Sequence, residues 1–582
     1  MTNETEATAY ASIYQIKRIC QDVDRGIDSE FSEIFSQERT RKKAWDYVDG
    51  LANPYLENKT TWGISEYKGY GNPGPLQSLI GENAWSWQRA WDITAVMAGK
   101  MAKRSAGSDR LGVGILFDET ADVKRGRMTC GVSYQHAGCA GGVANCTTWV
   151  MASLVGGTVK TWAASGLFLA EKEWFTGDGA KGTARRKSAG IPKRNRFATK
   201  PVIALRQLRR IRKLLRKNGI KLHHGGGDEV YGRFGQLLKD HEKNSEAYAY
   251  FVPRDKRAEL RKGMTVRADS LLELADGHWE RRRSGDGLKG PLYYGWAMIG
   301  LSSGRHYLLL RRPLPGDRRQ LAEEAEDRRK ADPGKSGPAA QATPRKGSGE
   351  PETDRVKEEM ITFCLCYVPP RSPIAPTLGN LVAMTGSRWS AEETNETGKG
   401  PIGWDENHFR KWDSMNKHTA LAGIAMLKSN MILEYLDTLG KKETGTAPPG
   451  LQEPGPPVYA ENPGPPEQDY GKEDLMVPLG DSAIPAGPDD HVPENIGFIR
   501  LSRDEALRIR EIAISGMSEA EMAFHLRCSK WRRRHQAVAR WHHRKARMKA
   551  MLEPAAQSPP RAPAAHRDIG RKQRPPAARS VA

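Results

Sequence analysis

The stretch KLHHGGGDEVYG at residues 221–232 decides the fold, because it supplies a strand between two helical segments. The strand is followed directly by a carboxylate, Asp228. His223 and His224 are adjacent, so in a strand they point to opposite faces and cannot chelate one ion together. Neither pattern of a phosphate-binding loop, GxGxxG or GxxxxGK[ST], is present. A plain glycine turn explains Gly225–Gly227 but leaves Asp228 without a role. The neighbouring segments are needed to choose between these readings.

Short β-rich runs and one clear helix surround this stretch. Three runs, at residues 111–118, 127–134 and 146–155, predict a three-strand meander. An amphipathic pattern predicts a helix over 200–217, with an apolar stripe formed by Val202, Leu205, Leu208, Ile211 and Leu215. A short helix from about Phe234 and a strand from Ala247 follow. The glycines suggest that the strand before Asp228 is weak. This order of strands and helices predicts a mixed α/β layer, in the order of the ribonuclease-H-like fold.

The composition favours a polyanionic partner. The 582 residues carry 91 Lys and Arg against 70 Asp and Glu, a net charge of +21. Such an excess points to nucleic acid or an anionic membrane face. The membrane is the weaker option, because no window approaches ~18 uninterrupted apolar residues. The polar, acidic N-terminus lacks the order of a secretion signal, so we expect a cytoplasmic protein.

The cysteines argue against both disulfides and structural zinc. Seven are spread over the chain, an odd number with no CxxC pair. The closest two, Cys364 and Cys366, fall on one face of an expected strand, where buried thiols are more common than zinc ligands.

Composition changes divide the chain into segments. We expect a helical N-terminal DNA-binding domain at 1–105, a first core part at 106–253, a β-rich insertion at 254–373 and the rest of the core at 374–440. Strands are predicted in the insertion at 292–301, 305–312 and 360–367, and its part 315–356 has the composition of a disordered segment. A Pro-rich linker at 441–495, a basic helical arm at 496–552 and a disordered tail at 553–582 complete the chain.

Three acidic residues together suggest a metal site. Asp118, in ILFDET, and Asp228 both follow apolar or glycine-rich strands, and Glu392 lies in RWSAEETNETGK. On a helix, Arg388, Glu392 and Lys399 share one face. Carboxylates on two strand ends and one helix are what a two-metal phosphodiester site requires, with Mg²⁺ or Mn²⁺ as the ions.

A series of motifs resembles the DDE-type insertion-sequence transposases with the type-five DDE endonuclease core, insertion-sequence family seven-zero-one. The motifs occur in family order, from about Phe31 to Leu427: PLQSLIGENAW, FDETADVKRGRMTCGVSYQHAGCAGGVANC, AGIP, FATKP, GDEVYG, FVPRD, GDGLKGP and RWSAEETNETGKG, with WRRRHQAVAR near the C-terminus. One such motif would be weak evidence, whereas the ordered set is strong.

The resemblance implies roles for individual residues. Asp118, Asp228 and Glu392 would be the catalytic acids and would bind two Mg²⁺ or Mn²⁺ ions. Arg388 and Lys399, with Lys289 in GDGLKGP, would contact DNA phosphates. The neighbouring acids Glu119 and Glu229 should point to the other side of their strands and be structural. Glu393 is a rival for the third acid, but the spacing from Arg388 favours Glu392.

The C-terminal arm reads as three helices within 501–550. Two capping boxes, Ser502 with Glu505 and Ser518 with Glu521, open the first two, which favours a helix-turn-helix. The third helix, at 530–549, contains many basic residues and no acid, and the candidates for DNA contact are Lys530, Arg532, Arg533, Arg534 and Arg540. A solvated basic helix with only non-specific affinity is the alternative.

The sequence thus predicts a transposase that binds the inverted-repeat ends of its own element and cuts and joins double-stranded DNA. A homo-oligomer is expected, because two element ends must be handled together. Two alternatives remain: a degenerate transposase that only binds DNA, and a nuclease with the same core that performs no joining.

Overall fold

The computed structural model describes residues 2–107, 109–176, 180–287, 290–314, 361–443, 501–514 and 517–552. The expected disordered segments at 315–356 and 553–582 lie outside these residues, as does most of the expected linker at 441–495. The N-terminal segment is helical, as predicted. Its helices are α1 (Thr2–Phe31), the short 3-10 helix η1 (Ser32–Ile34), α2 (Glu38–Ala52), α3 (Thr61–Tyr67), α4 (Gly74–Gly81) and α5 (Trp87–Ala106).

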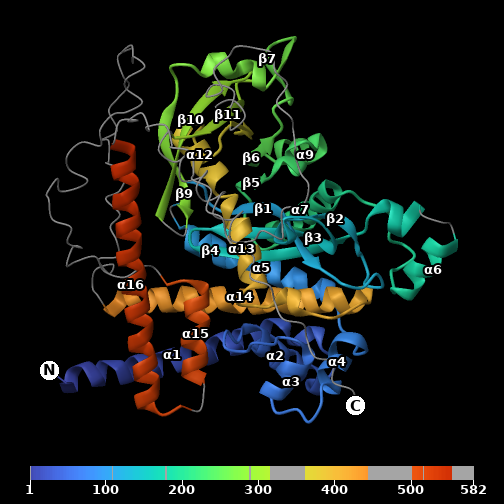
Figure 1. Ribbon diagram of the computed structural model, residues 1–582, viewed down its shortest axis with the longest axis vertical. Helices are drawn as coiled ribbons and strands as arrows, with labels where there is room; N and C mark the ends of the chain where they lie inside the picture. Colours follow the sequence, from blue (N-terminus) through green and yellow to red (C-terminus); the bar gives the residue numbers. More distant parts are fainter. Residues whose placement is uncertain are drawn as a thin grey trace, which may run out of the picture.

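A large mixed sheet forms the centre of the molecule (Figure 1). Within the described residues it has ten strands: β1 (Gly114–Val123), β2 (Ser133–Ala137), β3 (Gly142–Gly156), β4 (Val159–Phe168), β5 (His224–Gly227), β6 (Ala247–Val252), β9 (Glu280–Gly287), β10 (Gly290–Gly300), β11 (His306–Pro313) and β12 (Thr362–Tyr367). A separate hairpin contains β7 (Arg257–Arg261) and β8 (Met264–Arg267). The mixed α/β prediction is therefore confirmed.

The pairing of the strands joins the core and the insertion. β4 pairs with β3 and β3 with β1, both antiparallel, while β5 lies parallel between β1 and β6. β12 then pairs antiparallel with β6, and β11, β10 and β9 follow in that order. The strands predicted at 292–301, 305–312 and 360–367 are confirmed as β10, β11 and β12. They extend the central sheet and do not form a sheet of their own.

The predicted three-strand meander is wrong in detail. β1 runs on to Val123, so Asp118 lies within this strand and not at its end. The run at 127–134 is a strand only in its last two residues, and β4 was not predicted. The β4 sequence, VKTWAASGLF, contains several small residues, which give little strand signal by themselves.

Helices cover both faces of this sheet. The helix α7 (Lys200–Lys217) has the predicted bounds and packs with α5 against β3 and β4. The helix α13 (Trp389–Lys399) packs against β1, β3 and β4. Neighbouring residues of β1 contact these two helices, Asp118 contacting α13 and Glu119 contacting α7. Because successive strand residues point to opposite faces, α13 and α7 lie on opposite sides of the sheet.

Shorter helices connect these parts. They are η2 (Gly138–Ala140), the π-helical turn η3 (Lys172–Thr176), α6 (Ala180–Ser188), α8 (Glu229–Gly232), α9 (Gly235–Lys243), η4 (Asp269–Ala275), α12 (Leu378–Gly386) and η5 (Trp404–Glu406). No helix in the described ranges is long and apolar enough to cross a membrane. All seven cysteines are unpaired, and the sulfurs of Cys364 and Cys366 lie 3.9 Å apart on the same face of β12, as the spacing predicted.

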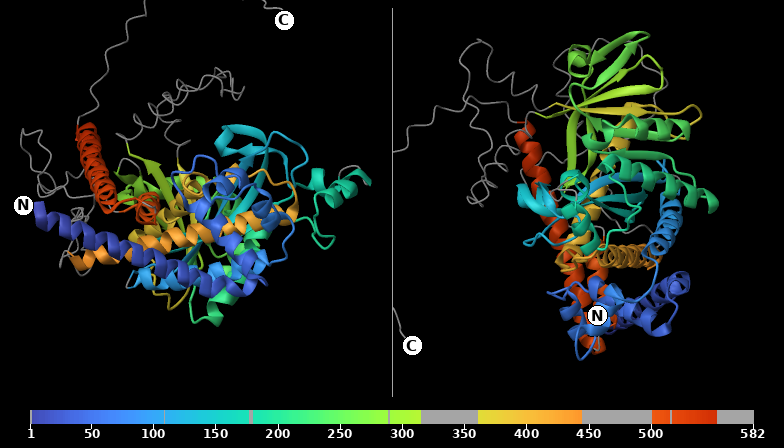
Figure 2. Two further views of the ribbon diagram at one scale, coloured as in Figure 1. Left: turned by 90° about the horizontal axis from the view of Figure 1, so that it is seen from below. Right: turned by 90° about the vertical axis from the view of Figure 1, so that its right-hand side faces the viewer.

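The long helix α14 (Trp412–Glu443) connects the sheet to the N-terminal helices. It packs against α1, α2, α4 and α5 as well as β4, and residues 420–430 are buried. The views in Figure 2 show this helix between the sheet and the N-terminal helices. The two halves therefore share one hydrophobic core.

The glycines of β5 are a packing requirement and not a weakness. All four residues of the strand are buried, and each pairs with both β1 and β6. A Cβ atom on Gly225 would lie 2.4 Å from the His241 ring, and one on Gly227 would lie 3.0 Å from the Tyr250 ring. His241 cannot move aside easily, because its ring nitrogens contact Glu246 at 2.9 Å and the Tyr250 hydroxyl at 3.0 Å. The expectation of a weak strand was wrong.

The C-terminal arm has two helices where three were predicted. The first is α15 (Arg503–Ile514), and the second and third predicted helices are one continuous helix, α16 (Glu519–Leu552). Both capping boxes form in part or in full: Ser502 Oγ accepts from the Glu505 amide at 3.1 Å, and Ser518 and Glu521 bond reciprocally.

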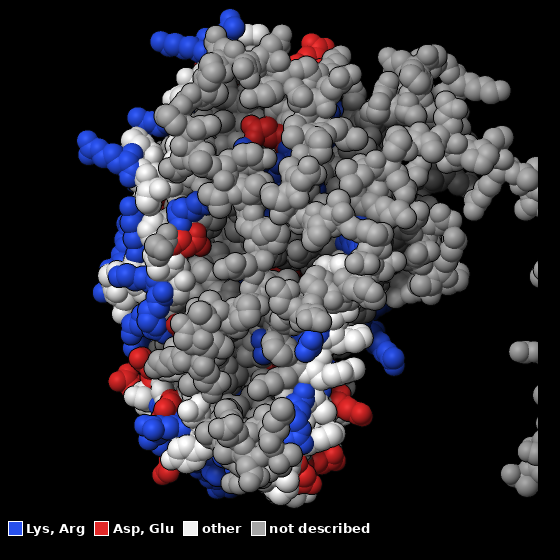
Figure 3. Space-filling model, turned by 90° about the vertical axis from the view of Figure 1, so that its left-hand side faces the viewer, with Lys and Arg blue, Asp and Glu red and all other residues white. Residues whose placement is uncertain are grey.

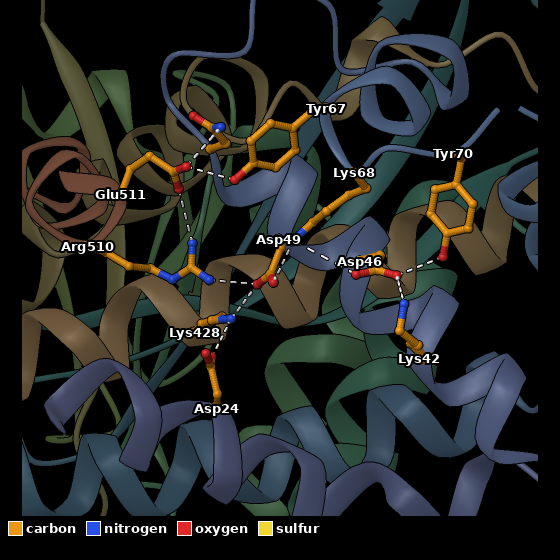
Figure 4. A network of polar contacts seen from close by, with 11 residues as sticks. Asp24, Lys42, Asp46, Asp49, Tyr67, Lys68, Tyr70, Lys428, Arg510 and Glu511 are labelled. Carbon is orange, nitrogen blue, oxygen red and sulfur yellow. Dashed lines mark hydrogen bonds and ion pairs between the residues drawn. The ribbon is translucent and has the colours of Figure 1, made fainter. Parts of the chain in front are cut away.

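The helix α15 is fixed to the N-terminal helices by a buried ionic cluster (Figure 4). Arg510, only 1% exposed, pairs with Asp49 of α2 at 2.7 Å, and Lys428 of α14 contacts the same carboxylate at 2.6 Å. Burial alone would raise the pKa of Asp49, but Lys428, Arg510 and Lys68 hold that pKa below its usual range. Glu511 accepts hydrogen bonds from the Tyr67 hydroxyl and the Asn53 amide. We name this group the Asp49 cluster.

The glycine requirement can be tested by stability measurements. We expect Gly225→Ala to lower the free energy of unfolding by about 1–3 kcal/mol, because the new methyl group overpacks the His241 ring. Gly235→Ala, at a position with no atom within 4 Å of the added Cβ, is the matched control and should change it by less than about 1 kcal/mol. Denaturant unfolding measures both, and equal effects of the two substitutions would contradict the packing argument.

The Asp49 cluster makes a second prediction. Removing a buried charge partner is costly, so Arg510→Met should lower the free energy of unfolding by about 3 kcal/mol. Arg508, on the same helix, is 36% exposed and pairs with Asp504, so Arg508→Met should cost less than about 1 kcal/mol. Thermal unfolding of the two variants provides the comparison. If Arg510→Met unfolds like Arg508→Met, α15 is not anchored through this residue.

Candidate active site

The strand register brings Asp118 and Asp228 together. β1 and β5 are parallel, and their last paired residues are Phe117 and Gly227. The residues that follow this pair are Asp118 after Phe117 and Asp228 after Gly227, and the two backbones are about 4.8 Å apart there. Residues at equivalent positions of parallel strands point to the same face, so the two carboxylates are neighbours. Local sequence alone did not establish this pairing.

Asp118 lies in a partly buried position beside α13. Its Oδ2 accepts a hydrogen bond of 2.9 Å from the Asn395 side-chain amide. Asn395 is held in turn by the Trp162 indole, which donates to its Oδ1 at 2.9 Å. Burial raises the pKa of Asp118 to about 7; Arg388 opposes this shift, while Asp228 and Glu392 add to it. Both other predicted acids thus lie within electrostatic reach of Asp118.

Asp228 is fixed by the helix that follows it. It is the N-cap of α8, and its Oδ1 accepts from the Val230 amide at 3.0 Å. Burial raises the pKa of Asp228, although the backbone hydrogen bonds, Arg388 and Lys200 act in the opposite direction. The cap orients the carboxylate without consuming all of its acceptor sites.

Glu392, and not Glu393, is among the groups that raise the pKa of Asp118. Glu393 forms an ion pair with Lys160 of β4, away from Asp118. Glu392 pairs with Arg388, whose guanidinium also lies 5.4 Å from the centre of the Phe251 ring. Arg388 therefore contacts one predicted acid directly and influences the other two. The choice of Glu392 as the third acid stays a prediction.

The residues predicted to bind DNA are spread over two regions. Lys399 lies in the last turn of α13, where its ammonium donates to the Ala121 carbonyl at 2.7 Å. Lys289 lies outside the described residues, as does the side chain of Lys530. On α16, Arg534 is exposed, Arg533 and Arg540 are partly buried, and Arg532 pairs with Glu505 of α15 at 2.7 Å. Arg532 thus has a structural partner that the sequence did not indicate.

Four further residues interact with the two aspartates or with their neighbours. They are Asn395, Glu119, Lys200 and Tyr231. Asn395 follows Glu392 by three positions, so helical spacing within the quoted motif could have identified it. Glu119 points to the α7 side, as predicted, and pairs with Lys200 at 3.6 Å.

Glu119 also interacts with the second aspartate and the buried Tyr231. Burial raises the pKa of Glu119, Lys200 opposes this, and Asp228 adds to it. Burial raises the pKa of Tyr231 too, with further contributions from Glu119 and Asp228. These are contacts between distant segments, for which the sequence carried no local signal.

The carboxylates suit divalent cations in kind. Mg²⁺ and Mn²⁺ prefer carboxylate oxygens, and Asp228 and Glu392 both add to the rise in the pKa of Asp118 that burial causes. Among the described residues, however, no three acidic, His or Cys side chains already lie close enough to hold one ion. The ion pair with Arg388 keeps Glu392 occupied. Asp118, Asp228 and Glu392 would hold such ions, and Glu392 would do so in place of its ion pair with Arg388.

The raised pKa of Asp118 predicts a pH dependence. The unfolded chain loses this proton near pH 4 and the native state near pH 7, so the native state binds the extra proton between these values. Stability should therefore fall as the pH rises over this range. Asn cannot ionise, so with a chelator present Asp118→Asn should unfold at a higher temperature than wild type at pH 8. The difference should shrink towards pH 4.5, by at most about 1.4 kcal/mol per pH unit. A difference that does not change with pH would contradict the assignment.

Comparison with known families matches part of the chain. Residues 30–259 match the family model described as DDE superfamily endonuclease. This range includes Asp118 and Asp228 but ends before Glu392. No curated protein matches the chain. Over the matched range the chain is similar to DDE superfamily endonucleases, which supports a transposase-type nuclease with DNA as its substrate.

Proposed function

We propose that the chain is a DDE transposase that cuts and joins DNA at the ends of its own insertion sequence. The observation that supports this most strongly is the convergence of Asp118, Asp228 and Glu392 from two parallel strands and one helix. These three carboxylates are the acids that the motif series implied. The assignment to insertion-sequence family seven-zero-one rests on that motif series.

The order of strands supports a ribonuclease-H-like core. Strands β4, β3 and β1 are antiparallel neighbours, and β5 and β6 continue the sheet in parallel on the other side of β1. The sequence predicted three strands, a helix, a strand, a helix and a strand for that fold, and β4 was not among the predicted strands. The first acid lies on the central strand and the second at the end of its parallel neighbour.

Positive charge near the acids supports a phosphate backbone as the substrate. Arg388 begins α13 and Lys399 lies in its last turn, so DNA phosphates near the acids would meet both side chains. The net charge is +21. Figure 3 shows Lys and Arg gathered along one margin of the face it presents, with acidic residues mixed in towards its lower end. The surface is therefore suited to a polyanion without being uniformly basic.

The helix α16 is a second DNA contact in this proposal. It packs against α15 and β10, and Arg534 and Arg540 with the exposed Trp531 lie along it. Basic side chains interspersed with aromatic ones are typical of nucleic-acid contacts. Because α15 belongs to the common core, this arm is fixed relative to the catalytic acids. Two copies of the chain, one for each element end, would act together. The protein would be cytoplasmic and associated with the nucleoid.

The chain's own residues prepare the reaction. Asp118, Asp228 and Glu392 would hold two Mg²⁺ or Mn²⁺ ions, which supply the Lewis-acid chemistry that activates the attacking oxygen and stabilises the leaving one. The α8 cap orients Asp228, and Asn395 orients Asp118. Once Arg388 leaves Glu392, its guanidinium is free to hold a phosphate beside the acids. The same geometry serves attack by water and attack by a freed 3′-OH.

Substitution of each acid tests the proposal. The substrate is a DNA fragment that carries the gene with its flanking sequence, incubated with Mg²⁺ or Mn²⁺. Asp118→Asn, Asp228→Asn and Glu392→Gln should each abolish cleavage and joining while DNA binding is retained. Calorimetric titration should show weaker Mn²⁺ binding for the same variants, because a ligand has been removed.

Neighbouring acids provide matched controls. Glu229→Gln and Glu393→Gln change a carboxylate next to a proposed ligand and should keep most of the cleavage activity. Cleavage without joined products would identify a nuclease, and binding without cleavage would identify a DNA-binding protein. Wild-type turnover in Asp118→Asn or Asp228→Asn would overturn the site assignment.

A further inference from the structure

A cavity of about 440 Å³ lies on the face of the sheet opposite the catalytic helix α13. Its walls come from the start of α5, the end of β4, the loop before α7, the first half of α7 and the start of α14. Figure 1 shows these elements around the end of the sheet that carries α6. The volume is in the range of small-molecule sites in proteins. None of the catalytic residues considered above lines it.

The mouth of the cavity is strongly basic. Arg194, Arg196 and Arg206 line it, and all three are exposed. In the part of the chain that the structure describes, none of them forms an ion pair with a carboxylate. By contrast, Arg209 and Arg210 on the same helix pair with Asp240 and Asp92. Three uncompensated guanidinium groups at one opening favour an anionic group, above all a phosphate.

The interior combines flat aromatic surface with an unused acceptor. Trp87 and Trp412 line the cavity and are only partly buried. Gln207, 8% exposed, donates from Nε2 to the Val150 carbonyl at 3.0 Å, but its buried Oε1 has no partner. Gly166 allows β4 to pack closely against α7, because a Cβ there would lie 2.5 Å from Ile203. A buried acceptor without a donor is costly unless a ligand supplies one.

A nucleotide has the chemical groups that match this lining: a phosphate for the arginines, a base for the indole rings and an N–H donor for the lone acceptor. The base would stack on an indole and donate an amino or ring N–H to Gln207 Oε1, while its phosphate meets the arginines. The cavity lies on the face of the sheet to which Glu119 points, because Lys200, which pairs with Glu119, and Arg206 are on the same helix, about 9 Å apart along its axis.

We propose that this cavity binds one unpaired nucleotide of the DNA substrate. The inference rests on the proposed function for the identity of the strand, but the cavity is separate from the catalytic acids. It predicts that DNA with an unpaired extension binds more tightly than the same duplex with blunt ends. The extra affinity should depend on the cavity residues alone.

Binding measurements on the full chain test this site. Fluorescence anisotropy would compare a blunt duplex with the same duplex carrying a three-nucleotide adenine extension. Trp412→Leu and Arg206→Gln should each weaken binding of the extended DNA about tenfold and leave the blunt duplex unchanged. Lys213→Gln, which removes an exposed charge elsewhere on α7, is the matched control and should affect both DNAs equally. Free deoxyadenosine monophosphate should compete only for the extension, and only weakly.

The outcomes separate this inference from the proposed function. If the wild-type protein did not bind the blunt duplex, that result would count against the proposed function. Intact blunt binding with no selective loss in Arg206→Gln, which changes an exposed side chain, would overturn the nucleotide site alone. Binding of the free monophosphate as tightly as the extended DNA would also overturn it, because the ligand would then be a free nucleotide.

Discussion

The close approach of the strands around β5 determines the position of the acids. Gly225–Gly227 carry no side chains, so the His241, Leu116 and Tyr250 side chains occupy the space on either face of this strand. β5 can then pair with β1 and β6 along its whole length. The parallel register puts Asp118 and Asp228 side by side. A larger residue in this strand would separate the sheet from the buried ring of His241, and the two carboxylates depend on that packing.

Buried charges fix the position of the C-terminal helix α15 against the N-terminal helices. Asp49 and Arg510 are 461 residues apart in sequence, yet their contact fixes α15 against α2 and α14. A cluster of this kind is weak evidence for added stability, because desolvation opposes the attraction. The effect of the cluster is on specificity, because α15 fits only where the Arg510 guanidinium meets Asp49. Arg503, at the start of the same helix, donates to the Lys160 carbonyl beside Glu393 of α13. The C-terminal segment is thus connected to the helix that carries Glu392.

Local patterns in the sequence predicted what local physics determines. The bounds of α7 follow from its apolar stripe and Pro201, and the face shared by Arg388 and Glu392 follows from helical spacing. Tertiary packing decided the features that were missed. The small residues of β4 form a strand because β3 and four helices cover them, and α16 is continuous where a break was expected. The pairs of Lys200 with Glu119 and of Arg532 with Glu505 join distant segments, so spacing could not predict them.

The charge balance around Asp118 connects stability to chemistry. Three carboxylates share a partly buried space, and Arg388 is the cation that contacts one of them directly while acting on the others. Burial is the main reason that the pKa of Asp118 rises to about 7; Arg388 opposes this rise, while Asp228 and Glu392 add to it. If these carboxylates hold a divalent cation, as proposed, the cation would displace the proton on Asp118. Stability and cation binding would then depend on the same buried group, Asp118.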